Sequence, residues 1–172
     1  RKTSNGNTVK ELKVPLSYGP RSKFLAKIED DGNANKNTAI TLPRLSFEMS
    51  GFSYDSQRKL NSLGVRYNTT ETGSEKSMDN PVPYNIGFSL DVYVEHFDEG
   101  LQIIEQIVPF FSPYLNIPSK LVYDDMGIVD DVPVLLNDVS LEESYEGQFE
   151  DKRVIMWNLS FTLKTNIFKP VK

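Results

Sequence analysis

The sequence predicts one α+β domain, in which about two helices pack on one face of a twisted, mainly antiparallel sheet. Three observations support this fold class. Two segments alternate between apolar and polar residues, the first of them strictly, the segment after the first carries a helical stripe, and the 172 residues show no internal repeat. Because a chain of this length can bury a sizeable core, we expect residues 1–172 to form a single domain.

The clearest strand signals lie at residues 85–95 and 154–163. Every second residue in each segment is apolar, which is typical of a half-buried antiparallel strand. The apolar face of the first segment consists of Ile86, Phe88, Leu90, Val92 and Val94. The apolar face of the second consists of Ile155, Trp157, Leu159, Phe161 and Leu163. We expect both segments to lie in the sheet with these faces toward the core.

A helix is predicted directly after the first of these strands. Its apolar residues recur at helical spacing, and they are Phe97, Leu101, Ile104, Val108 and Phe111. Asp98 and Glu99 lie in the first turn, where the helix dipole favours acidic side chains. Pro109 is expected to end or kink this helix.

The N-terminal part predicts a strand and a short helix. Residues 9–18 read as a strand that Pro15 interrupts, so we place it at an edge of the sheet. Pro20 suits the first position of a helix. The apolar face of this helix would consist of Phe24, Leu25 and Ile28. Residues 30–38 are rich in Asn, Asp and Gly and predict a loop.

Residues 39–55 predict a long, bent strand. Its alternation shifts phase at Pro43 and again at Gly51, and such shifts indicate bulges. Residues 63–70 predict a partner strand. Residues 71–83 are polar and contain glycine and two prolines, so they predict a mobile loop. Two shorter strands, at 117–123 and 129–139, are expected around an aspartate-rich turn.

The residue types exclude several kinds of chemistry. The chain has no cysteine, which excludes disulfides, zinc–thiolate sites and cysteine nucleophiles and suits assembly in a reducing cytoplasm. No apolar run reaches the roughly 20 residues that span a bilayer. His96 is the single histidine, and without a Gly-x-Ser-x-Gly elbow we interpret it as structural or exposed. Phosphate-loop and dinucleotide motifs are also missing from the sequence.

Two acidic pairs are the remaining candidates for a site. Clustered oxygens suit calcium, but the EF-hand spacing is missing, and we interpret the pairs as a solvated turn. The pairs are Asp124–Asp125 and Asp130–Asp131. No basic–aromatic interleaving predicts a nucleic-acid surface, and we assign Tyr54, Tyr67 and Tyr93 to packing or interfaces. We interpret the glycosylation-like triplets at Asn68 and Asn158 as chance. The sequence thus predicts no catalytic, cofactor-binding or metal residue, and therefore no cofactor and no enzyme.

Charge is distributed unevenly along the chain. Residues 1–27 hold seven Lys or Arg and one Glu, a net charge of +6, whereas residues 121–151 hold ten Asp or Glu and no Lys or Arg. These stretches could be two solvated surfaces. Alternatively, opposite patches on identical subunits could meet head to tail, and such heterologous contacts close rings. An acidic stretch of this length argues against nucleic-acid binding.

The order of several short motifs resembles one protein family. The motifs are Val14–Tyr18, Leu42–Phe47, Phe52–Tyr54, Glu105–Phe111 and Trp157–Phe161. Together they resemble the T4-type proximal tail sheath stabilisation proteins, also called tail completion or terminator proteins. The resemblance runs from about residue 14 to the end. The family often carries a long polar C-terminal extension, whereas the sequence given stops at Lys172, and the acidic 121–151 stretch is matched less clearly.

The resemblance implies a structural virion protein at the tail–neck junction. It implies a homo-hexameric ring on the last ring of the tail tube, with contacts to the tail sheath protein and to neck or head-completion proteins. The edges at 9–18 and 39–55 and the loop at 71–83 are the expected contact segments. Two alternatives stay open: another ring-forming neck, connector or baseplate module, or a small acid-rich enzyme such as a glycosidase or metal-dependent hydrolase.

Overall fold

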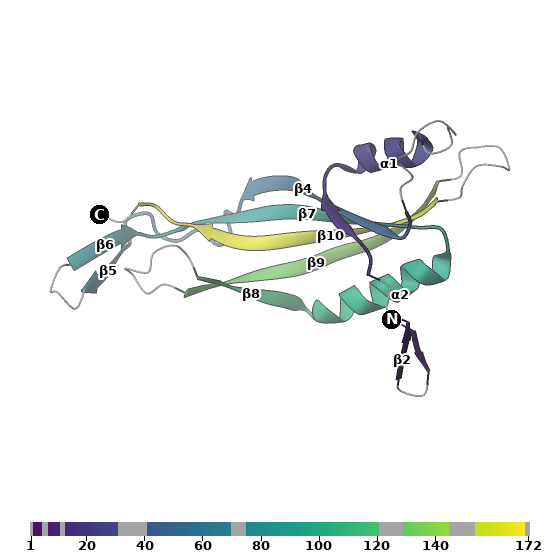
Figure 1. Ribbon diagram of the computed structural model, residues 1–172. Helices are drawn as coiled ribbons and strands as arrows, with labels where there is room; N and C mark the ends of the chain where they lie inside the picture. Colours follow the sequence, from purple (N-terminus) through teal and green to yellow (C-terminus); the bar gives the residue numbers. More distant parts are fainter. Residues whose placement is uncertain are drawn as a thin grey trace.

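The fold is an elongated, six-stranded sheet with one helix on each face (Figure 1). The structure is a computed structural model that describes residues 2–4, 7–10, 13–30, 41–69, 75–120, 129–144 and 154–170. Within these residues the strand order is β3-β4-β7-β10-β9-β8. Every neighbouring pair is antiparallel except β3 and β4, which are parallel. The α+β class and the mainly antiparallel sheet are therefore confirmed.

The strands of this sheet differ greatly in length. Their bounds are β3 Leu16–Tyr18, β4 Arg44–Tyr54, β7 Val82–Val94, β8 Tyr114–Lys120, β9 Val129–Ser144 and β10 Val154–Ile167. β7 and β10 form the centre and pair without interruption from Val94 opposite Ile155 to Val82 opposite Ile167. The two strongest alternating segments of the sequence are therefore the two central strands, as predicted.

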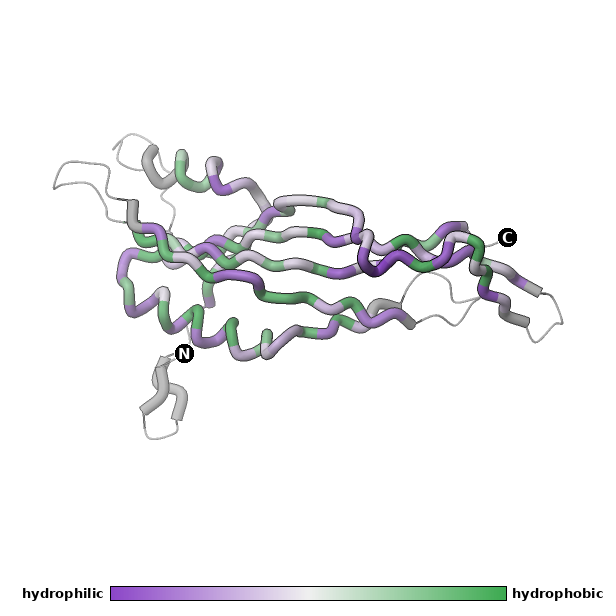
Figure 2. The backbone as a smooth tube through the Cα atoms, turned by 180° about the vertical axis from the view of Figure 1, so that it is seen from behind, coloured by the Kyte–Doolittle hydropathy of each residue, from purple (hydrophilic) through white to green (hydrophobic). Residues whose placement is uncertain are grey.

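Helix α2 covers part of the apolar face of the sheet. It spans Phe97–Ile107 and passes into a short 3-10 turn, η1, at Val108–Phe110, so it ends where Pro109 predicts. Its Ile104 packs against buried core residues of the two central strands and of β9. These core residues are Val92, Val94, Val134, Ile155, Leu159 and Phe161. Figure 2 shows the alternation of hydrophobic and polar residues along the strands from behind.

Helix α1 lies on the opposite face, which corrects the expectation of two helices on one face. It spans Arg21–Asp30 and packs Phe24 against Tyr93 and Met156. These two strand residues alternate with Val92 and Ile155 and therefore point away from α2. Figure 1 shows α1 above the sheet and α2 below it. The sequence predicts where each helix lies along the chain, but alternation alone does not say which face a helix covers.

Two small hairpins lie outside the main sheet. β1 (Lys2–Ser4) pairs with β2 (Asn7–Lys10), and β5 (Val65–Thr69) pairs with β6 (Glu75–Asp79). The single strand predicted at 9–18 is therefore wrong, because its ends belong to β2 and to the edge strand β3. The partner strand predicted at 63–70 exists, but it pairs with β6 instead of β4. The mobile loop predicted at 71–83 is also wrong over 75–79 and from Val82 onward.

The remaining strand predictions hold with shifted bounds, but the bulge predicted at Pro43 is wrong, because β4 begins only at Arg44. The bulge expected at Gly51 is present as a register shift between Met49 and Gly51, and β8 and β9 form the predicted antiparallel pair. The loop at 31–38 and the aspartate-rich turn at 121–128 lie outside the described residues. Among the described helices, none is long and apolar enough to cross a membrane.

Candidate assembly surfaces

The outer edge of β4 is only partly covered. The short strand β3 pairs with Leu45–Phe47, and no described strand lies beside the rest of β4, Glu48–Tyr54. Backbone bonds close the covered part, because Leu45 N donates to Pro15 O over 2.9 Å and Gly19 N donates to Phe47 O over 3.0 Å. The uncovered part is a strand edge of the kind that pairs with other chains. We call it the open β4 edge.

The direction of the backbone groups along this edge follows from the pairing with β7. Asp55 N donates to Pro83 O over 3.1 Å, so the backbone at Asp55 points toward β7. Because the direction alternates along a strand, the N–H and C=O groups of Phe52 and Tyr54 point toward the open edge. This part of β4 therefore has backbone donors and acceptors available for another strand.

Aromatic side chains accompany the open edge. Phe52 is 53% exposed and stacks on Tyr84 with ring centroids 4.6 Å apart, and Tyr54 meets the same ring edge-on at 5.8 Å. All three rings lie on the face of the sheet that α2 covers further along, because Phe52 pairs with Ile86. An exposed cluster of this kind beside unpaired backbone is typical of an interaction surface.

The bulge that shapes this edge depends on a glycine in the neighbouring strand. Gly87 lies opposite Gly51, and a Cβ atom at Gly87 would lie 2.6 Å from the Ser50 hydroxyl oxygen. A larger residue at 87 would therefore displace Ser50, the extra residue of the bulge. Glycine at position 87 thus leaves room for the Ser50 side chain in the bulge.

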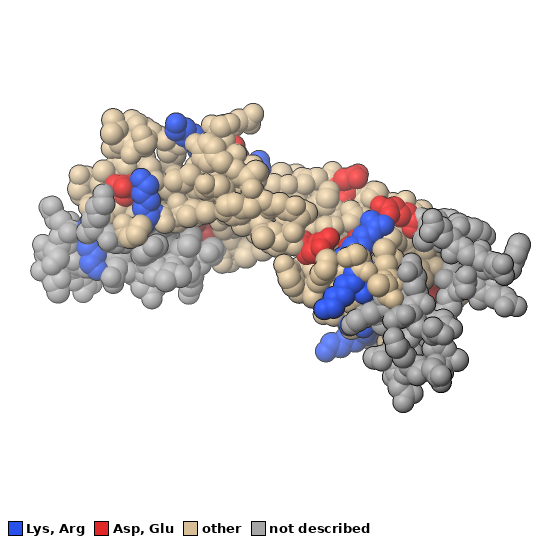
Figure 3. All heavy atoms as spheres, turned by 90° about the horizontal axis from the view of Figure 1, so that it is seen from above, with Lys and Arg blue, Asp and Glu red and all other residues tan. Residues whose placement is uncertain are grey.

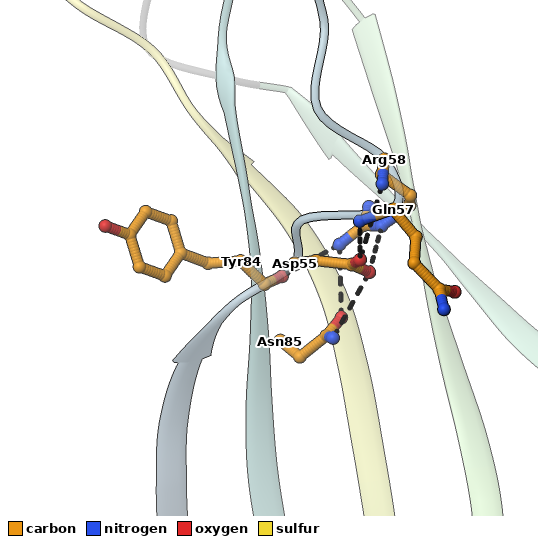
Figure 4. Close-up of polar contacts among 5 residues, drawn as sticks. All are labelled: Asp55, Gln57, Arg58, Tyr84 and Asn85. Carbon is orange, nitrogen blue, oxygen red and sulfur yellow. Dashed lines mark hydrogen bonds and ion pairs between the residues drawn. The ribbon is translucent and has the colours of Figure 1, made fainter.

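A compact polar cluster holds the end of β4 in place (Figure 4). The Asp55 carboxylate accepts hydrogen bonds from Arg58 Nε over 2.8 Å and from Asn85 Nδ2 over 3.2 Å. Arg58 also donates to the carbonyl oxygen of Tyr84 over 3.0 Å. The hydrogen bond from Arg58 is the main reason that the pKa of Asp55 is lowered to about 2. The cluster thus ties the chain after β4 to the strand that carries Tyr84.

The opposite edge of the sheet, β8, is also exposed. Its Tyr114, Leu115 and Ile117 are exposed, and so is Phe110 in the preceding turn η1. Within the described part of the chain, β8 pairs with β9 alone. The sheet therefore has two edges, the open β4 edge and β8, that combine unpaired backbone with exposed apolar side chains.

A third exposed apolar surface lies on the β5–β6 hairpin, which extends beyond the end of the sheet (Figure 1). Leu63 is 85% and Tyr67 72% exposed, while Met78 at the base is fully buried. The base is held by backbone bonds, including Asn80 N to Gly64 O over 2.9 Å. Tyr67 and Tyr93 are both predicted to serve in packing or interfaces, and the structure exposes Tyr67 and packs Tyr93 in the core.

The face beneath α1 hides polar groups that the sequence pattern assigns to solvent. Asn158 Nδ2 donates to Asp91 Oδ1 and to Ser89 Oγ, both over 2.7 Å, and Ser46 shares a hydrogen bond with the Tyr93 hydroxyl. Burial raises the pKa of Asp91 and raises that of Tyr93 to about 12. The amide of Asn158 is thus engaged inside the protein, which agrees with its interpretation as a chance glycosylation match.

Part of the predicted charge complementarity is satisfied within one chain. Arg21 of α1 forms an ion pair with Glu142 of β9, so a basic residue of the N-terminal stretch contacts the acidic stretch of the same subunit. Asp130 accepts a hydrogen bond from Asn166 Nδ2 over 3.0 Å. Figure 3 shows charged side chains near both ends of the α1 face and an uncharged middle.

The structure describes some of the other residues considered for chemistry. His96 precedes the first turn of α2 with an exposed side chain, and its carbonyl oxygen accepts from Glu99 N over 3.1 Å. Asp131 is exposed, and Asp124 and Asp125 lie outside the described residues. No group of three or more potential metal ligands occurs among the residues that the structure describes. The surfaces with a clear functional character are therefore the exposed apolar edges.

Comparison with known proteins gives these edges a context. The family model of the T4-like virus Myoviridae tail sheath stabiliser matches residues 1–172. The chain belongs to this family. It is also 26% identical over 168 residues to the tail completion protein gp15 of Enterobacteria phage T4. That match covers 94% of this chain, and the chain spans about 62% of the length of that relative.

The family assignment confirms the resemblance seen in the motifs. Sequence reasoning found the open β4 edge through its phase shifts. It missed the Asp55–Arg58–Asn85 cluster and the buried Asp91–Asn158 pair, because polar residues at alternating positions carry no signal of their partners.

Proposed function

We propose that this protein forms a hexameric ring that caps the head-proximal end of a contractile phage tail tube, stabilises the sheath and joins the tail to the neck. It is proposed to be a non-enzymatic virion protein that assembles in the host cytoplasm and works at the tail–neck junction. Its partners would be copies of itself, the tail tube protein, the tail sheath protein and neck or head-completion proteins.

The observation that carries the proposal is the large uncovered part of the sheet in a chain that matches the sheath stabiliser family throughout. Helix α2 has 11 residues and is about 16 Å long. Strand β7 has 13 residues and is about 43 Å long, so α2 leaves more than half of the strand length uncovered. The uncovered length carries Phe52, Tyr54 and Tyr84 and is bordered by unpaired strand edges.

A subunit with three separate exposed apolar surfaces suits a protein with several simultaneous neighbours. The open β4 edge, the β8 edge and the β5–β6 hairpin lie on different sides of the molecule (Figure 1). Ring neighbours need two of these surfaces, and a tube or sheath subunit needs at least one more.

The direct test is to image the purified protein by electron microscopy, alone and together with tail tubes and sheath. We expect six-fold rings, and we expect one ring at a single end of each tube. A stable monomer at every protein concentration would contradict the ring. Binding to the portal in preference to the tube would favour the alternative of a head–tail connector.

A further inference from the structure

We infer that neighbouring subunits join edge to edge, with the open β4 edge of one copy pairing in parallel with β8 of the next copy. This inference rests on the proposed ring. The occupant of the open edge is thus a second copy of this chain. The contact is heterologous, since two different edges meet, and repetition of such a contact closes a ring.

The two edges lie at the same level of the sheet. Following the printed registers straight across the five strands, Phe52 lies opposite Ile86, Ile86 opposite Leu163, Leu163 opposite Val134, and Val134 opposite Leu115. Residues 51–54 of β4 are therefore level with residues 114–117 of β8. A neighbour related by rotation about an axis along the strands brings these two segments together.

The strands also run in compatible directions. Between β4 and β8 there are four antiparallel steps, so β4 and β8 point the same way within one subunit. Rotation about a ring axis keeps the direction of a strand along that axis. The junction between β4 of one copy and β8 of the next must therefore be parallel. A two-fold contact between two β4 edges, or between two β8 edges, would instead be antiparallel and would give dimers.

Side chains on the two edges match in character. The row that joins the edges is apolar from end to end and lies on the face covered by α2. At its ends Phe52 is 53% and Leu115 36% exposed, whereas Val134 within the row is buried. Pairing the edges would place Phe52 of one copy beside Leu115 of the next and continue the apolar row across the junction.

One residue limits the length of the junction. Pro118 has no N–H group, and proline in a sheet is confined to positions such as edge strands, where no ladder bond is lost. In β8 it interrupts the row of donors after Ile117. The pairing is therefore expected to be short and to centre on residues 114–117, the same residues that lie level with the open β4 edge.

Cross-linking tests the contact directly, because the chain has no cysteine of its own. Ser53→Cys and Asn116→Cys replace exposed polar residues that follow Phe52 and Leu115 and therefore point to the opposite face. Within one chain the two edges are four strand spacings apart, about 19 Å, which a disulfide or a short bismaleimide cannot span. A bond between the two positions must then join two copies.

We expect the double variant, treated with a short bismaleimide that tolerates an offset in register, to give a ladder of covalent oligomers up to the ring. Each single variant should stay monomeric on a denaturing gel. As a matched control, Ser53→Cys combined with Glu105→Cys, on the exposed side of α2, should give no ladder.

Rings in the untreated protein without a ladder in the double variant would overturn the edge-to-edge contact and leave the proposed ring intact. Covalent dimers of the Ser53→Cys single variant would also overturn it, because they indicate a two-fold contact between β4 edges. A protein that forms no rings at all would remove both the contact and the proposed function.

Discussion

The two halves of the α2 face carry the same sequence pattern but have opposite surroundings. Under α2, the alternating residues Val92, Val94 and Leu159 are fully buried. Beyond the end of α2, Phe52, Tyr54 and Ile117 occupy equivalent positions on the same sheet and remain exposed. The difference comes from the length of the helix, which is shorter than the strands that it covers. Alternation thus identifies which face is apolar, and only the tertiary structure identifies what covers it.

This contrast suggests a division of roles. The covered half stabilises the fold of one subunit, and the uncovered half is available to stabilise an assembly. Substitutions in the covered half should therefore lower the free energy of unfolding of the subunit. Substitutions in the uncovered half should weaken association and leave the fold largely intact.

The largest expected effect is in the covered half. Leu159→Ala removes a fully buried side chain from the centre of β10 and leaves a cavity, which typically costs about 2–5 kcal/mol. Urea unfolding at one fixed protein concentration measures the loss. A change below about 1 kcal/mol would contradict the assignment of this half as the folding core.

The next effect should be in the uncovered half. Phe52→Ser removes an exposed ring that stacks on Tyr84, so the free energy of unfolding of the dissociated subunit should change by less than about 1 kcal/mol. Association should weaken by about 2 kcal/mol, as for a central interface aromatic. Light scattering over a dilution series measures the midpoint of dissociation. Unchanged association would place the ring contact elsewhere. The control is Ser53→Ala, a change at the residue next to Phe52 that points to the other face of the sheet.

Gly100→Ala tests how closely α2 approaches the sheet. A Cβ atom at this position would lie 2.4 Å from Trp157 Nε1, so the helix or the indole must move. Overpacking typically costs about 1–3 kcal/mol of stability. The better helix propensity of alanine returns only about 1 kcal/mol. Thermal unfolding should show a net loss. A higher melting temperature would mean that α2 packs less tightly than described.

A smaller effect is expected from Arg21→Ala on the other face of the sheet. Its ion pair with Glu142 holds α1 over the buried polar groups, but both side chains are partly exposed to solvent. Exposed pairs of this kind contribute about 0–1 kcal/mol. A double-mutant cycle with Glu142→Ala measures the coupling. A coupling well above this range would show that α1 docking depends on the pair and not mainly on Phe24.

The smallest effect on stability is that of Asp55→Asn, and it should depend on pH only in the acidic range. The pKa of Asp55 is lowered to about 2 from its ordinary value of 3.8, so its ionised form stabilises the fold. This contribution is present in full above pH 3.8 and is lost as the pH falls toward 2. The difference in unfolding free energy between the wild type and Asp55→Asn should therefore shrink over this interval. A difference that stays constant with pH would contradict the Asp55–Arg58 contact.

The central strands and α2 could be predicted because burial on one side leaves a clear period in the sequence. β6 could not, because only Met78 of its Glu75–Asp79 segment is apolar, and a single apolar residue makes no alternating pattern. Ser46 and Asp91 follow the polar phase of their strands and look solvent-facing. They are fully buried because α1 covers them, and a helix on the polar face leaves no trace in the alternation.

The candidate surface was partly predictable in the same sense. Pro15 and the phase shift at Gly51 point to an edge and a bulge, and both are present. That Phe52 and Leu115 lie in one row across five strands depends on four pairing registers, which no local pattern encodes. The open β4 edge could therefore be predicted from the sequence, whereas its alignment with β8 could not.

Residue-resolved amide hydrogen exchange tests most directly whether the uncovered half becomes an assembly surface. In the dissociated subunit, the amides of Phe52 and Tyr54 should exchange rapidly, while those of Gly51 and Ser53, which face β7, should be protected. In the assembled protein, all four should be protected. Rapid exchange of Phe52 and Tyr54 in an assembled ring would contradict the account.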